Sequence, residues 1–195
     1  MTISRIEYFA KYAGLATVAV EWSALAIYYL KMPLYFGGKY PISYYATLPQ
    51  TKWVFSTCYV LAAIFCWIFT RHHLTKYFYL PLRIFAISMV LFAATGLFPY
   101  NPDNTVSAII HTALALSSGL LYLAGMCALA RHTKDKIVFT TTIIAIVLSL
   151  SLTVAFMLSP RNSHLIFSFE AGSWLVLQIW MIWISFYVRK RRVLS

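Results

Sequence analysis

Six long apolar runs dominate the sequence, and short polar or basic segments separate them. Each run approaches the roughly 20 residues that a helix needs to cross a bilayer. Only 11% of the 195 residues are charged, whereas a soluble domain carries roughly 25%. Because so few charges cannot cover a water-facing surface, we expect an all-α polytopic membrane protein, a bundle of six transmembrane helices in one domain. The expected spans are residues 12–30, 53–70, 82–98, 106–129, 137–158 and 167–188.

The basic residues gather at the ends of the apolar runs, where membrane topology uses them. The net charge of +11 therefore gives no reason to expect a nucleic-acid partner. Twelve of the 16 Lys and Arg residues lie in the two terminal segments, in the loops after the second and fourth runs, or, as Arg83, at the start of the third run. The positive-inside rule then places both termini in the cytoplasm. We expect a multi-pass protein of the plasma (inner) membrane with the turn at 99–105 on the outer, periplasmic side.

The first run resembles the apolar core of a signal peptide, but it is too long and Glu21 lies in its middle. We therefore expect a retained span. Small and polar residues flank Glu21 at helical spacing, and such a stripe turns toward other helices rather than lipid. These flanking residues are Gly14, Thr17, Ala24 and Tyr28.

The segment from residue 31 to residue 52 is the longest loop, and three prolines and a Gly-Gly pair exclude a continuous helix. Its five aromatic residues suit the headgroup zone of a bilayer. We expect this loop to lie along the membrane surface as a partial cap. A second break, residues 96–103, combines proline with Asn and Asp, which is strong turn chemistry. Asp103, Asn104 or Thr105 can cap the helix that follows.

Three of the five acidic residues, Glu21, Asp103 and Glu170, lie at mid-membrane or toward the outer face, as does His111. If the first, fourth and sixth spans touch, these four residues and Pro99 line one outward-facing polar pocket. An ionised carboxylate at the bilayer centre costs on the order of 3 kcal/mol or more. Glu21 is therefore expected to be protonated, or hydrogen-bonded to His111 or to a hydroxyl. The plainer alternative is a neutral glutamate that ties two helices together.

His111, Asp103 and Glu170 allow two kinds of chemistry. They could hold a divalent metal through nitrogen and oxygen ligands. Alternatively, His111 could act as a general base beside an orienting carboxylate, or it could simply pack between helices. The sequence contains no Ser-His-Asp motif, phosphate loop or His-x-x-x-His pair. No cofactor is identified, and a divalent metal remains open.

The segment Gly96-Leu97-Phe98-Pro99, a Pro-Asp turn and then His111 in the next run together resemble the signature of the DUF998 family. This family of six-span prokaryotic membrane proteins is similar in layout to Frag/DRAM/Sfk-type proteins. Its pattern often has an acid before or within the turn. In this sequence Asn101, not an acid, stands directly before the proline of the turn, so any role of a turn carboxylate depends on Asp103. The resemblance implies a membrane protein without an established activity, and relatives connected with lipid remodelling favour a lipid over an ion.

Three functions therefore remain open. The first is a non-enzymatic protein that binds or senses membrane lipid, or supports a protein partner or a homo-oligomer, through the pocket. The second is a membrane-embedded hydrolase or transferase that acts on a lipid with His111, Asp103 and Glu170. The third is a small proton-coupled transporter that uses Glu21, although the sequence shows neither an inverted repeat nor paired broken helices. We expect the first function.

Overall fold

A computed structural model describes residues 5–33, 42–72, 79–98, 104–160 and 165–194. Within these ranges the chain forms helices and no strand, which confirms the all-α prediction. The elements are α1 (Arg5–Lys31), the 3₁₀ helix η2 (Ile42–Ala46), α2 (Lys52–His72), α3 (Tyr79–Thr95), α4 (Thr105–His132), α5 (Lys136–Leu158) and α6 (Ile166–Leu194).

The apolar character of the helices makes this a membrane bundle. Five helices are long and apolar enough to cross a bilayer, and α3 contributes a shorter apolar stretch, Leu80–Thr95. Large apolar side chains remain exposed on the bundle, such as Leu120, which is 68% exposed, and Met157, which is 61% exposed. Such exposure is favourable when the side chains face the acyl chains of a bilayer instead of water. The protein is therefore a six-helix membrane bundle.

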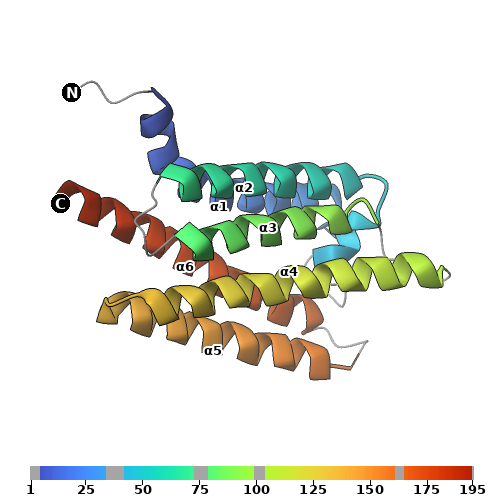
Figure 1. Ribbon diagram of the computed structural model, residues 1–195. Helices are drawn as coiled ribbons and strands as arrows, with labels where there is room; N and C mark the ends of the chain where they lie inside the picture. Colours follow the sequence, from blue (N-terminus) through green and yellow to red (C-terminus); the bar gives the residue numbers. More distant parts are fainter. Residues whose placement is uncertain (1–4, 34–41, 73–78, 99–103, 161–164, 195) are drawn as a thin grey trace.

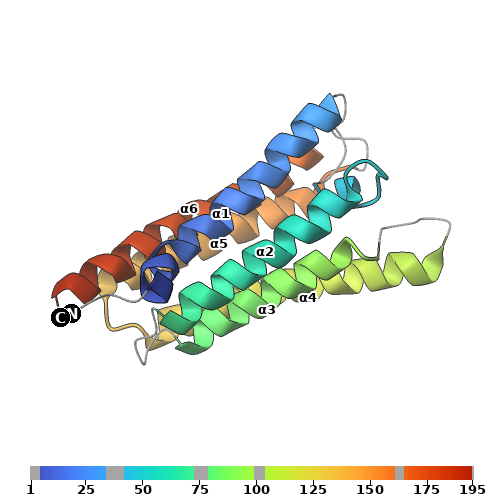
Figure 2. The same cartoon turned by 90° about the horizontal axis from the view of Figure 1, so that it is seen from above.

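The helices run antiparallel in chain order, and α6 returns to contact α1 (Figure 1). Both chain ends lie at one end of the bundle (Figure 2), which we call the termini end, and η2 lies at the opposite, far end. Contacts are dense from α1 through α4 and between α5 and α6. They are sparser between α4 and α5 and between α1 and α6. A four-helix set, α1–α4, is thus joined to a hairpin, α5–α6, along two seams.

The end of α3 comes earlier than the expected span end at residue 98. The N–H of Gly96 donates to the carbonyl of Ala93 at 3.1 Å, and that of Leu97 to Ala94 at 3.0 Å. These i→i+3 bonds tighten the chain into a turn and stop the helix at Thr95. On the other side of the break, Asn104 caps α4 by accepting from the Ser107 N–H at 3.1 Å. The predicted cap is confirmed, with Asn104 as the residue that forms it.

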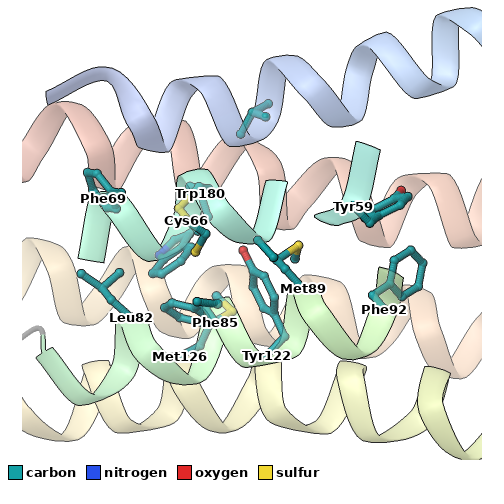
Figure 3. Packing of buried hydrophobic residues seen from close by; sticks show 14 of the residues in the cluster. Tyr59, Cys66, Phe69, Leu82, Phe85, Met89, Phe92, Tyr122, Met126 and Trp180 are labelled. Atoms are coloured by element: carbon teal, nitrogen blue, oxygen red, sulfur yellow. The ribbon is translucent and has the colours of Figure 1, made fainter. Parts of the chain in front are cut away.

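Aromatic side chains from α6 join the two parts of the bundle. Trp174 contacts Phe92 with ring centroids 4.4 Å apart, and Tyr59 with centroids 5.4 Å apart. Nearer the termini end, Trp180 meets Phe85 edge to face at 5.4 Å. Figure 3 shows Trp180 and Phe85 in the middle of the buried cluster, with Tyr59 and Phe92 further along it. The hairpin is therefore packed into the core of the four-helix set by large apolar surfaces.

The glycines of α4 provide a matched test of this packing. A Cβ at Gly125 would lie 2.7 Å from the fully buried ring of Phe85 and 3.1 Å from the carbonyl oxygen of Pro81. At Gly119 a Cβ would meet no atom within 4 Å. Gly125→Ala should destabilise the fold by about 1–3 kcal/mol through overpacking. Gly119→Ala should leave stability unchanged or raise it by up to about 1 kcal/mol through helix propensity.

Thermal unfolding of the purified protein in detergent micelles checks this prediction. Equal shifts of the unfolding midpoint for the two variants would contradict the close α3–α4 packing.

Candidate functional site

A cavity of about 390 Å³ lies where the hairpin meets the four-helix set, with lining residues from α1, α3, α4, α5 and α6. Most of its wall is apolar. The polar side chains along it are Thr17, Glu21, Ser88, Ser118, Tyr122, Ser149, Thr153, Glu170, Ser173 and Gln178. The cavity therefore combines an apolar wall with a small set of polar groups, which is typical of small-molecule sites.

The mouth of the cavity lies between α4 and α5. Among the lining residues, every exposed one belongs to one of these two helices. The cavity thus opens at the side of the bundle, whereas the sequence led us to expect a pocket that opens at the outer face. The exposed lining residues are Leu116, Gly119 and Leu120 on α4 and Leu150, Val154 and Met157 on α5.

Glu21 lies in the wall of this cavity and joins the first helix to the last. Its side chain is 3% exposed, and the Gln178 amide nitrogen donates to its Oε2 at 2.6 Å. The expected stripe is confirmed, because Gly14, Thr17, Ala24 and Tyr28 are all buried on the same face of α1. The partner of Glu21 is therefore an amide on α6, not His111 or a hydroxyl.

Hydroxyl groups form the other polar links around the cavity. Ser88 of α3 and Ser118 of α4 each donate to the other's backbone carbonyl, at 2.8 and 2.9 Å. On the opposite side, Ser173 of α6 lies 2.8 Å from the Ser149 hydroxyl and 3.1 Å from that of Thr153, both on α5. Such cross-helix hydrogen bonds satisfy polar side chains where lipid offers no partner.

Glu170 lines the far end of the cavity and binds a backbone group. Its carboxylate accepts from the N–H of Ile42, the first residue of η2. In the same short helix, the buried Tyr45 ring stacks on Tyr28 with centroids 4.7 Å apart. Burial raises the pKa of the Tyr45 hydroxyl to about 12, so it stays neutral. The described part of the loop thus packs against the far end of the bundle through Glu170 and Tyr28.

His111 is buried but does not line the cavity. Its Nδ1 lies 2.9 Å from the carbonyl oxygen of Phe98 and 3.3 Å from that of Thr95. Because carbonyls only accept hydrogen bonds, Nδ1 must carry the proton. His111 therefore holds the end of α3 against α4, as the packing interpretation expected.

Pro99 and Asp103 lie outside the described residues, so their grouping with His111 and Glu170 stays a prediction. In the described part of the chain, no three His, Cys, Asp or Glu side chains gather in a way that could hold a metal ion. Of the expected pocket residues, the structure brings Glu21 and Glu170 to one cavity.

Gln178 is the site residue that sequence reasoning missed. Glu21 lies ten residues before the end of α1 at Lys31, and Gln178 lies twelve residues after the start of α6 at Ile166. Since the two helices run in opposite directions, these positions fall at a similar depth. Two polar side chains at matching depth in antiparallel apolar runs could therefore have indicated from the sequence that Glu21 and Gln178 form a pair.

Comparison with known families decides the assignment. Residues 15–187 match the family model described as "Protein of unknown function (DUF998)". The chain belongs to the DUF998 family. This match contains Glu21, His111, Glu170 and Gln178. No curated protein and no solved structure matches the chain, and the similarity in layout to Frag/DRAM/Sfk-type proteins stays a prediction.

The placement of His111 in this DUF998 protein predicts a structural effect of its substitution. His111→Leu removes the donor to the carbonyls of Phe98 and Thr95 and should cost about 1–3 kcal/mol of stability, since the buried Thr95 carbonyl and the part-buried Phe98 carbonyl both lose this partner. His111→Asn places an amide near the position of Nδ1 and should recover part of that loss. Thermal unfolding measures both variants. A fully stable His111→Leu variant would show that the hydrogen bond contributes nothing to the fold.

Proposed function

We propose that this DUF998 protein binds a lipid-like amphiphile that enters the cavity sideways from the bilayer. The observation that carries the proposal is the lateral mouth between α4 and α5, with the buried Glu21–Gln178 pair behind it. The ligand's chain would lie along the apolar mouth, and its polar group would reach the pair. The volume of about 390 Å³ falls within the range of roughly 300–1,000 Å³ for small-molecule pockets.

A ligand dissolved in the membrane fits the mouth better than one dissolved in water. Leu120 and Met157 are among the most exposed side chains of the lining and come from the two helices that form the mouth. In a bilayer, this face of α4 and α5 meets acyl chains. A lipid-soluble ligand reaches the mouth without leaving its own solvent, whereas a water-soluble ligand would first have to cross lipid.

The mouth offers a test through Gly119, where a Cβ would point into open space. Gly119→Phe should fill the mouth without disturbing the core and reduce bound lipid at least fivefold. The control is Ala124→Phe, also at an exposed position of α4 but outside the lining. Native mass spectrometry of the purified protein counts bound lipid after exposure to an equimolar mixture of oleyl alcohol, oleylamine, oleic acid and oleyl phosphate. Equal lipid on wild type and Gly119→Phe would contradict the proposed entrance.

We also propose that the termini end faces the cytoplasm and that the far end faces the periplasm. The support is the charge distribution, since twelve of the 16 Lys and Arg residues fall in segments at the termini end. The plasma (inner) membrane is the location that this orientation fits.

Cysteine labelling tests the orientation. The three native cysteines, Cys58, Cys66 and Cys127, are free and are first replaced by alanine. Single cysteines are then placed at Thr105 and Lys134, exposed positions at opposite ends of the bundle. A membrane-impermeant maleimide added to intact cells should label position 105 and not position 134. Labelling at 134 alone would reverse the orientation.

A further inference from the structure

We infer that the bound amphiphile carries an uncharged or cationic hydrogen-bond donor, an alcohol or an amine, that Glu21 and Gln178 recognise. Anionic lipids with a phosphate or carboxylate head would be excluded. This inference rests on the proposed lipid-binding function and specifies its ligand. It follows from the charges, the hydrogen bonds and the shape of the cavity.

The carboxyl groups of the cavity have no basic side chain beside them on its wall. Among the described lining residues, Glu21 and Glu170 are the ionisable acids, and none is Lys, Arg or His. Anionic heads are normally held by Arg, Lys or clustered N–H groups. Buried charges without such partners are costly, and like charges in an apolar site repel each other. A phosphate or a carboxylate therefore has no suitable partner on this wall.

The polar groups also favour a donor in the ligand. The hydroxyl hydrogens of Thr17, Ser88 and Ser118 are directed at backbone carbonyls, at distances of 2.8 to 3.1 Å. Thr153 likewise donates to the Ser149 carbonyl at 2.8 Å. Their hydrogens are therefore used within the protein. The Tyr122 hydroxyl and the second N–H of Gln178 remain as donors on the wall, and the hydroxyl, amide and carboxyl oxygens provide more acceptors than these two groups provide donors.

The Glu21–Gln178 pair supplies the acceptors at the centre. Gln178 uses its amide nitrogen on Glu21 Oε2. Within the described chain, no hydrogen bond involves Glu21 Oε1 or Gln178 Oε1. Both side chains line the cavity and are at least nine-tenths buried, at 3% and 5% exposed. Two oxygens from different helices thus lie where an alcohol O–H or an ammonium N–H can donate to them.

The remaining wall suits one apolar chain. The mouth itself is lined by apolar side chains, among them Leu116, Leu120, Leu150 and Met157. A chain with its polar end at Glu21 would leave the protein between α4 and α5 and continue into the bilayer. The ligand class is therefore a long-chain alcohol or amine, or a larger neutral lipid with such a group.

Four ligands with the same oleyl chain test this inference: oleyl alcohol, oleylamine, oleic acid and oleyl phosphate. Each is titrated separately against the purified protein in micelles, and native mass spectrometry measures binding. The alcohol or the amine, or both, should bind at least tenfold more tightly than the two anionic ligands. Which of the two binds identifies the donor.

Two variants of Glu21 locate the recognition. Glu21→Gln keeps an acceptor for Gln178 but cannot become an anion that pairs with an ammonium group. It should therefore weaken amine binding about tenfold and change alcohol binding less than threefold. Glu21→Leu removes the acceptor and should weaken both at least tenfold. Thermal unfolding verifies that each variant is folded. If a variant does not fold, the selectivity of the wild-type protein among the four ligands still decides the ligand class.

The outcomes separate the two proposals. If the wild type binds none of the four ligands, the lipid-binding function fails. If it binds all four equally, or the anionic ligands more tightly, lipid binding stands and the donor class is overturned. If Glu21→Leu folds and binds as the wild type does, recognition by the pair is overturned.

Discussion

The hydrogen bond between Gln178 and Glu21 is the constraint on which the arrangement of this bundle depends. A carboxyl group in the hydrocarbon region needs a polar partner, because lipid supplies none. The partner is an amide on the last helix, 2.6 Å away. The bond therefore fixes α6 against α1 along a seam where the helices contact each other sparsely. It joins the hairpin to the four-helix set at the depth of the cavity.

The two seams of the bundle are built differently. The α1–α6 seam has the Glu21–Gln178 bond, and hydroxyl pairs join α3 to α4 and α5 to α6. The mouth at the α4–α5 seam is lined instead by apolar side chains such as Leu120 and Val154. Separating apolar side chains in a lipid solvent costs dispersion contacts that acyl chains can replace. The proposed entry of a lipid through this seam would therefore separate apolar side chains and leave the hydrogen bonds named above intact.

Much of the fold and part of the site could be predicted from the sequence. The apolar runs predicted the helices, and the energetic cost of Glu21 singled it out as a site residue. The sequence could not choose its partner, because the partner depends on which helices touch. The role of His111 depends on the backbone carbonyl of Phe98, which the identity of a side chain does not reveal. The early end of α3 at Thr95 likewise follows from backbone hydrogen bonds around Gly96.

The two carboxylates of the cavity have different physical roles. Glu170 accepts from the backbone of Ile42 and thereby ties η2 to the start of α6 at the far end. Glu21 is held by one neutral amide and keeps an oxygen available at the centre. The packing of η2 at the far end and the confinement of the exposed lining to α4 and α5 both support the proposed entry from the bilayer. Under this proposal, Glu170 keeps the far end of the cavity in place while Glu21 meets the ligand.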